Sequence, residues 1–379
     1  MDERRDWLAL TRAPGLHAEA IAQLVQRFGS VREVCAAPFD ALIAAGAGEQ
    51  AAKRLAHPDA TRLDADLHWL DQPGHALIPY TSEAYPALLK QLRHAPLALF
   101  VRGNAAALQL PQLAMVGTRN PTALGRETAH AFAAHLAKHG LAITSGLAVG
   151  IDAASHEGAL RADGVTIAVC AAGLDVVYPR EHRQLADAIC ERGALTSQFP
   201  PQTPMAKYLF PVRNRLISGL SLGTLVVEAA VHSGSLITAR FAAEQGREVF
   251  AIPGSIHNTL ARGCHQLIRQ GAKLVESAAD ILSELGPLTA TLTADKERAP
   301  ATELPETAAN SAALLDKEYK ILLDALGFDP VGVDQLVART GLRTDAIASM
   351  LLILELDGWV ESQPGGLYAR TRAHAKTLL

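Results

Sequence analysis

The chain has 379 residues, enough for two or three domains, and 49% of them are hydrophobic, enough to bury a core of ordinary size. Its formal net charge of −4 excludes a protein that coats nucleic acid through bulk positive charge, so any anion site must be local. The charged start, Met1-Asp2-Glu3-Arg4, is unlike a signal peptide, and no apolar run approaches the ~18 residues of a membrane span. The cysteines show no metal-ligand spacing, so we expect a cytoplasmic protein without a bound metal.

The first part of the chain is predicted to be helical. Apolar residues such as Ile21, Leu24 and Phe28 recur at helical spacing, and turn signals separate the segments. This pattern predicts a small module over residues 1–72, similar to a helix–hairpin–helix or SAM-like bundle. Such bundles bind the DNA backbone in some proteins, but the corresponding face carries few cations here, which favours a packing or interaction role.

From Gln112 onward, short apolar runs alternate with glycine turns and helical stretches. Strands are expected at residues 113–116, 141–144, 166–170, 195–197, 224–227, 249–252 and 273–275. Helices are expected between most of them, at residues 125–138, 153–161, 181–191 and 236–244. The alternation predicts an α/β core over residues 76–285, with an extended Rossmann-like parallel sheet covered by helices on both faces. Ligands of such sheets lie beyond the carboxyl ends of the strands.

A composition change marks the C-terminal part. Residues 286–312 contain Pro287, Pro300 and Pro305 among Thr, Ala and charges, which predicts a flexible linker. Beyond the linker, a winged helix is expected over residues 313–375, with helices and a hairpin at residues 319–326, 333–339, 344–356 and 360–369. The helix expected at residues 344–356 carries Asp345 and Glu355 and no cation. This composition disfavours base reading in a DNA groove and favours a protein-contact or weakly basic accessory role.

The stretch from Phe210 to Glu228 is the most informative one. It belongs to one of three segments that lack acidic residues but hold several cations, namely residues 84–126, 193–227 and 249–275. Arg213 and Arg215 diverge if this stretch is helical, whereas on an extended segment they could straddle one anionic backbone. A local cation excess beside an aromatic ring suits a polyanion with stackable rings.

The loop Gly117-Thr118-Arg119-Asn120-Pro121 follows a strand and precedes a helix. A helix N-terminus offers free amides to an anion, and an arginine adds a bidentate phosphate contact. The alternative is an ordinary turn with an exposed arginine.

The sequence gives little support for an enzyme or a nucleotide-binding protein. There is no GxGxxG after the first strand, no GxxxxGK[ST] and no GxSxG elbow. Asp152 is interpreted as a helix-start cap rather than a general base, and His232 as part of a polar turn that opens the next helix.

Several blocks in one order resemble the DNA-processing protein A (DprA, or Smf) family. They occupy residues 116–125, 145–152, 172–179, 210–221, 228–229, 233–240 and 245–254. The resemblance implies a single-stranded DNA-binding protein that protects incoming DNA in natural transformation and helps to load a RecA-type recombinase. It also implies a homodimer formed through the core domain, no cofactor and no enzymatic activity.

The same resemblance assigns site residues. Arg119 would hold phosphate beside Gly117 and Thr118, while Lys207 and Phe210 would supply a backbone charge and a base-stacking ring. Further cations expected at the site are Arg180, Arg213, Arg215 and Arg240.

Two rival hypotheses remain. The segment Leu222-Gly223-Thr224 through Glu228 is similar to part of the loop of phosphoribohydrolases that cleave nucleoside monophosphates, but the Pro-Gly-Gly that should precede it is missing. In the other hypothesis the chain is a scaffold that contacts recombinase through its tail and does not itself bind DNA. Deleting residues 312–379 distinguishes the scaffold from a DNA-binding core.

Overall fold

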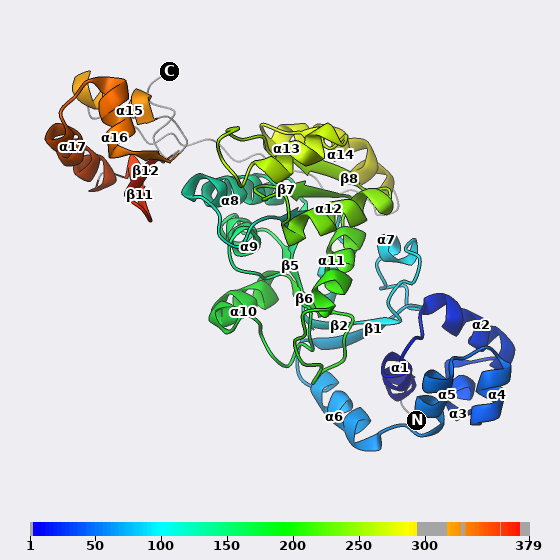
Figure 1. Cartoon of the computed structure of the whole chain (residues 1–379). Coiled ribbons are helices and arrows are strands. Elements are labelled where there is room, and N and C mark those ends of the chain that lie inside the picture. Colours follow the sequence, from blue (N-terminus) through cyan, green and yellow to red (C-terminus); the bar gives the residue numbers. More distant parts are fainter. Residues whose placement is uncertain (1–2, 294–316, 327–329, 357, 372–379) are drawn as a thin grey trace.

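The computed structural model describes residues 3–293, 317–326, 330–356 and 358–371 (Figure 1). The N-terminal part is helical, as predicted. Its helices are α1 (Glu3–Thr11), α2 (Ala18–Phe28), α3 (Val31–Ala36), α4 (Phe39–Ala44), α5 (Glu49–Ala56) and α6 (Ala60–Leu70). Side-chain caps define several helix starts; for example, Ser30 accepts from the Glu33 amide at α3 and Asp59 from the Arg62 amide at α6.

A nine-stranded sheet forms the centre of the molecule, in the order β1-β2-β6-β5-β4-β3-β7-β8-β9. The strands from β6 to β9 in this order are parallel, and all of them were predicted: β3 (Gln112–Val116), β4 (Ala142–Ser145), β5 (Thr166–Val169), β6 (Ala194–Ser197), β7 (Gly223–Val226), β8 (Glu248–Ala251) and β9 (Lys273–Leu274). The antiparallel strands β1 (His75–Pro79) and β2 (Ala98–Gly103) were not predicted. The sheet is therefore parallel except at one edge.

Helices cover both faces of this sheet, so alternate residues of a strand enter different cores. In β3, Ala114 and Val116 pack with α11 (Leu209–Leu220), α12 (Gly234–Glu244) and α13 (Arg262–Arg269). Leu113 and Met115 pack on the opposite face with α8 (Ala123–Lys138), α9 (Ile151–Arg161) and α14 (Ala278–Thr293). Burial on both faces explains why these strands are almost continuously apolar.

Shorter elements complete the core: α7 (Ala87–Lys90), η1 (Ala105–Gln109), η2 (Arg180–His182) and α10 (Arg183–Arg192). The N-terminal helices pack directly on the sheet, because Leu8 of α1 and Leu63 of α6 share one apolar cluster with Phe100 of β2 and Leu195 of β6.

The structure decides between two arrangements that the sequence left open. The stretch that begins at Phe210 is helical in α11, so Arg213 and Arg215 point in different directions and cannot straddle one backbone. Pro211 is the third residue of α11, and proline is tolerated in the first turn because the amide it lacks would have no intrahelical partner there. The first residues of the predicted linker, 286–293, belong to α14, which extends to Thr293; residues 294–312 lie outside the described residues.

The C-terminal part is a winged helix. Its elements are β10 (Val331–Gly332), β11 (Val360–Gln363), β12 (Leu367–Arg370), α15 (Lys317–Leu326), α16 (Val333–Thr340) and α17 (Thr344–Leu356). The strands form an antiparallel sheet in the order β10-β12-β11, of which β10 was not predicted. Leu322, Leu336, Leu351 and Trp359 form a separate core. Among the described residues, no helix combines the length and apolar character needed to traverse a lipid bilayer.

Candidate nucleic-acid interface

A groove lies where the chain leaves the carboxyl ends of β3, β4 and β5, as expected for a doubly wound sheet. One part is a cavity of about 150 Å³ lined by Arg119, Tyr178, Phe210, Arg213 and nine neighbours, among them Ala148, Cys170, Ala172 and Met205. A second cavity of about 260 Å³ adjoins it and is lined in part by Gly117, Thr118, Asn214 and Ser235. Arg119, Phe210 and Arg213 line both cavities. We call these three residues the Arg–Phe–Arg cluster.

Both arginines of the cluster approach the same aromatic ring. The Cζ atom of Arg119 lies 5.4 Å from the centroid of the Phe210 ring, and that of Arg213 lies 5.8 Å from it. Both distances are within the range of a cation–π interaction. The ring of Tyr178 is tilted against Phe210 with centroids 6.4 Å apart, and Tyr178 is 50% exposed. The groove thus combines two guanidinium groups with two rings that a base could contact.

Arg213 is built into the protein rather than displayed on its surface. Its side chain is buried, and its Nη1 donates to the Val169 carbonyl at 3.0 Å, while its Nε has no hydrogen-bond partner in the described part of the chain. Burial lowers the pKa of Arg213, but an arginine stays charged at neutral pH. Gly146 makes room for it, because a Cβ atom there would lie 1.6 Å from Nη1 of Arg213. Arg213 therefore places a fixed positive charge at the base of the groove and has a hydrogen-bond donor left for a ligand.

Asp152 does not cap α9, contrary to expectation, because the cap position is Gly150 and carries no side-chain bond. The Asp152 carboxylate is buried and accepts hydrogen bonds from the amides of Gly146 (3.1 Å) and Ala148 (3.4 Å). Burial raises the pKa of Asp152, and the charge of Arg213 opposes that shift. Asp152 therefore holds the β4–α9 loop that forms one wall of the groove.

Arg119 lies on the exposed side of the groove. It belongs to the loop between β3 and α8 and has no acidic partner within 4 Å among the described residues. Gly150, with a φ of +87°, packs against this loop, since a Cβ atom there would lie 2.4 Å from the Thr118 carbonyl oxygen. Arg119 is therefore a charge on a firmly packed loop, available to a ligand from solvent.

The start of α8 is not the open backbone anion site that the sequence suggested. The buried Glu228 carboxylate accepts from the Thr122 amide at 2.9 Å and from the Thr122 hydroxyl at 2.7 Å. Thr122 Oγ1 in turn accepts from the Gly125 amide at 2.9 Å, and the Thr118 amide donates to the Glu228 carbonyl at 2.7 Å. The protein's own carboxylate occupies this position, and its negative charge would repel a phosphate. Anion binding at the groove must rely on side chains.

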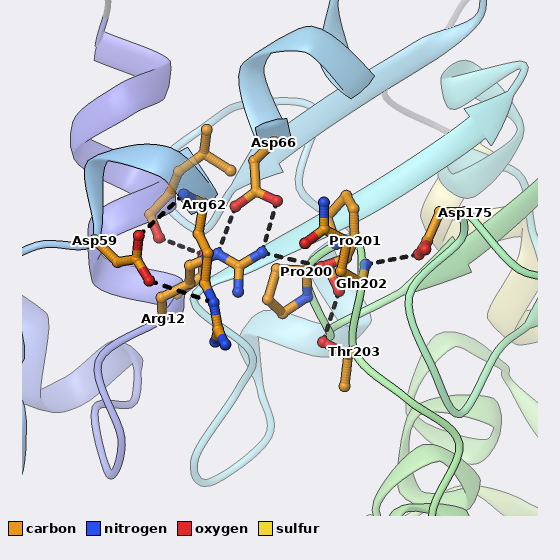
Figure 2. A network of polar contacts seen from close by, with 11 residues as sticks. Arg12, Asp59, Arg62, Asp66, Asp175, Pro200, Pro201, Gln202 and Thr203 are labelled. Carbon is orange, nitrogen blue, oxygen red and sulfur yellow. Dashed lines mark hydrogen bonds and ion pairs between the residues drawn. The ribbon is translucent and has the colours of Figure 1, made fainter. Parts of the chain in front are cut away.

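Lys207 is exposed in the turn that precedes α11, one residue before Tyr208, which is 74% exposed. The loop that leads to Lys207 is held by hydrogen bonds to two different parts of the chain (Figure 2). Arg12, directly after α1, donates to the Pro201 carbonyl at 3.0 Å and forms a bidentate pair with the fully buried Asp66 at 2.5 and 2.6 Å. On the other side, the Gln202 amide donates to Asp175 at 2.8 Å. The N-terminal helices thus help to position the loop that carries Lys207.

The remaining predicted cations lie outside the groove. Nη1 of Arg215 donates to the His94 carbonyl at 3.3 Å, on another side of α11. Arg240 is exposed on α12 and lies 3.6 Å from Glu244. Arg180 lines a neighbouring surface hollow with Asp175 and Arg183. The structure therefore brings Arg119 and Arg213 to Phe210 and does not bring Arg180, Arg215 or Arg240 there.

Sequence reasoning missed three contributors. Tyr178 is an aromatic residue in a strand-end loop, a signal that was available. Gly146 and Glu228 gave no usable signal, because their roles depend on contacts with Arg213 and Thr122 that are distant in sequence. A group with metal-ligand chemistry, His17, Glu19 and His94, lies away from the groove, where α2 meets the segment before β2.

Comparisons with known proteins show which family the two folded parts resemble. The family model of the DNA recombination-mediator protein A matches residues 76–286, and that of the DprA winged helix domain matches residues 305–366. Protein Smf of Escherichia coli (strain K12) is 40% identical over 375 residues, which cover 97% of this chain and 95% of that protein.

Two solved structures are similar as well. DNA processing protein A of Streptococcus pneumoniae superposes with a TM-score of 0.65 and 36% identity, covering 74% of this chain and 97% of that one. DNA processing protein A of Helicobacter pylori, which has a distinct mode of binding single-stranded DNA, superposes with a TM-score of 0.51 and 27% identity, covering 56% and 96%.

Proposed function

Because the chain belongs to the DNA recombination-mediator protein A (DprA) family, we propose that it binds single-stranded DNA in the groove at the carboxyl ends of β3, β4 and β5. The observation that carries this proposal is the Arg–Phe–Arg cluster, in which two guanidinium groups lie within 6 Å of one accessible aromatic ring. A single strand offers phosphates and unpaired bases together, and such a site suits both. The Helicobacter pylori relative, whose ligand is single-stranded DNA, supports the assignment.

Each group has a separate task in this proposal. Arg119 and Lys207, both exposed, neutralise phosphates, while Phe210 and Tyr178 stack with bases. Arg213 is a fixed charge beneath them, and the Thr122 amide at the start of α8 takes no part because it donates to Glu228. Stacking and phosphate contacts do not depend on base identity, so binding should be largely independent of sequence.

The wider role follows from the family. We propose that the protein protects incoming DNA in natural transformation and helps to load a RecA-type recombinase, and that it acts in the cytoplasm as a homodimer formed through the core domain. The name of the matching family, a recombination mediator, supports the recombinase role. The four cysteines are unpaired thiols, as suits a reducing compartment.

We divide the chain into a helical module (residues 1–72), a DNA-binding core (76–285), a linker (286–312) and a winged helix (313–375). The separate apolar core of the winged helix supports the last boundary. α14 begins within the proposed core and continues to Thr293, across the proposed core–linker boundary.

We propose a binding function rather than catalysis. The rival phosphoribohydrolase hypothesis needs Glu228 to face a substrate, yet its two carboxylate oxygens accept hydrogen bonds from Thr122 and its side chain is buried. A Cβ atom on Gly125 would lie 2.3 Å from this carboxyl group, which shows how closely α8 covers it. Release of free base from a nucleoside monophosphate would overturn this part of the proposal.

The test is a fluorescence-anisotropy titration of labelled oligothymidine at two salt concentrations, with duplex DNA as competitor. The wild type should prefer the single strand, and Arg119→Ala should bind more weakly with a salt slope reduced by about 0.7. Arg54→Ala, which removes an exposed cation of α5, is the matched control and should behave as the wild type. Equal binding by Arg119→Ala and the wild type would contradict the site.

A further inference from the structure

Two histidines and a glutamate meet where the N-terminal helices contact the core. His17 is the N-cap of α2, and Glu19 lies in the first turn of the same helix. His94 comes from the segment between α7 and β2. One potential ligand atom from each residue lies within 4.8 Å of the other two. The three residues thus form a compact donor set drawn from two parts of the chain about 75 residues apart.

The distances from the Glu19 carboxylate to the two imidazoles match the edges of a tetrahedral metal site. Oε2 of Glu19 lies 3.4 Å from Nδ1 of His17 and 3.3 Å from Nδ1 of His94. In a tetrahedral zinc site with bonds of about 2.0–2.1 Å, the edge between two ligand atoms is about 3.3–3.4 Å. The two imidazole rings are edge-on to one another, with centroids 4.5 Å apart. Two imidazoles and one carboxylate are also a ligand set that zinc accepts.

The backbone holds these groups in place without help from a ligand. His94 has a φ of +57°, in the left-handed region that is uncommon for residues other than glycine, although asparagine, aspartate and histidine are enriched there. Its amide donates to Oε1 of Glu19 at 3.4 Å, and its carbonyl accepts from Arg215 at 3.3 Å. Glu19 therefore turns one oxygen toward the His94 backbone and the other toward both rings. This arrangement orients the ligand, as outer contacts do in metal sites.

We propose that His17, Glu19 and His94 bind one zinc ion, with water in the fourth position. Nδ1 of His17 now accepts a hydrogen bond of 3.3 Å from the Ala20 amide, and a metal would take over that lone pair. The loss is that of one N-cap hydrogen bond, which a metal–imidazole bond exceeds. The side chains are 35%, 51% and 48% exposed, so the ion would reach the site directly from solvent.

Such an ion would fasten α2 to the core. It would join α2 to the segment that precedes β2, and Arg215 would connect that segment to α11, the helix that carries Phe210 and Arg213. The same N-terminal helices reach the Lys207 loop through Arg12. Zinc would thus stabilise the contact between the helical module and the DNA-binding core at a second point.

The test uses the tag-free full-length chain, stripped with a chelator. Zinc is titrated against a chromophoric competitor, and Co²⁺ is used to report coordination by its visible absorption. The wild type should bind one equivalent and give the intense band of four-coordinate cobalt, whereas Glu19→Gln and His94→Asn should lose both. His94→Asn is chosen because asparagine tolerates the left-handed backbone at this position.

His57→Ala is the matched control, because His57 is an exposed histidine on the same module and should leave binding unchanged. One equivalent of zinc should also raise the melting temperature of the wild type and of His57→Ala but not that of His94→Asn. Zinc binding by His94→Asn at the wild-type level, or none by the wild type, would overturn the proposal.

Discussion

Replacing Phe210 by alanine tests the stacking role of the Arg–Phe–Arg cluster. The ring is partly exposed, and both guanidinium groups lie within 6 Å of its centroid. Loss of one stacked base costs about 1–3 kcal/mol, which is about a 5- to 150-fold loss of affinity. The substitution also removes two cation–π contacts and so leaves Arg119 less well oriented, which places the expected loss in the upper half of that range.

The assay is oligothymidine anisotropy over a series of salt concentrations. Because the ring carries no charge, Phe210→Ala should shift the whole curve and leave the slope of log K against log salt unchanged. Arg119→Ala should instead lower that slope by about 0.7. Phe210→Trp should retain binding, and Phe210→Leu should not, since leucine fills volume but has no aromatic face.

A double-mutant cycle adds a further check. Arg119 and Phe210 are in contact, so the two substitutions should not be additive. If Phe210→Ala binds as the wild type at every salt concentration, the stacking role is wrong. If its slope falls instead, the ring acts mainly by orienting charges.

Four other perturbations follow from the structure. Gly146→Ala should displace Arg213 and weaken DNA binding, with a stability loss of about 1–3 kcal/mol, measured by anisotropy and urea unfolding. Asp66→Ala breaks a buried ion pair and should lower the free energy of unfolding by about 3–5 kcal/mol. Burial lowers the pKa of His156 from 6.5 to about 3, so the imidazole is protonated in the unfolded chain before it is protonated in the folded one as the pH falls. The free energy of unfolding should therefore be highest above pH 6.5 and decline by about 1.4 kcal/mol per pH unit below it, as measured by urea unfolding at several pH values. A chain lacking residues 312–379 should still bind oligothymidine, whereas loss of binding would contradict a DNA-binding core.

Matched variants serve as controls for the pH dependence and for the buried ion pair. His156→Asn removes the buried imidazole and should flatten the pH dependence, although it gives up the hydrogen bond to Thr166 at 2.6 Å and lowers stability at neutral pH. His57→Asn, at an exposed position, should leave the pH dependence as in the wild type. A wild-type pH profile for His156→Asn would show that another group is responsible. Asp64→Ala, on the exposed side of α6, should cost less than 1 kcal/mol and so calibrate Asp66→Ala.

The parallel part of the sheet could be predicted because its strands are buried on both faces and stand out as short apolar runs. Strands β1 and β2 escaped prediction because they are antiparallel, flank a segment without a long helix and interrupt the strand–helix alternation. The helix α11 was hard to recognise because Pro211 suggests a break, although its position in the first turn is compatible with a helix.

The candidate site was predictable in its residue types but not in its arrangement. Arg119, Arg213 and Phe210 could be chosen from the sequence, but only the fold shows that they converge and that Arg215 turns away toward His94. The role of Glu228 depends on a contact across 106 residues with Thr122, which no local pattern indicates.

The contact of Glu228 with the start of α8 affects how the binding surface can change when its sequence changes. Backbone amides are the same in every sequence, so a site built on them keeps its strength through most substitutions. Where the Thr122 and Gly125 amides are already bonded, affinity must come from individual side chains, and each of these can be altered by a single codon change without disturbing the sheet. The strength of binding at such a surface can therefore be raised or lowered in small steps.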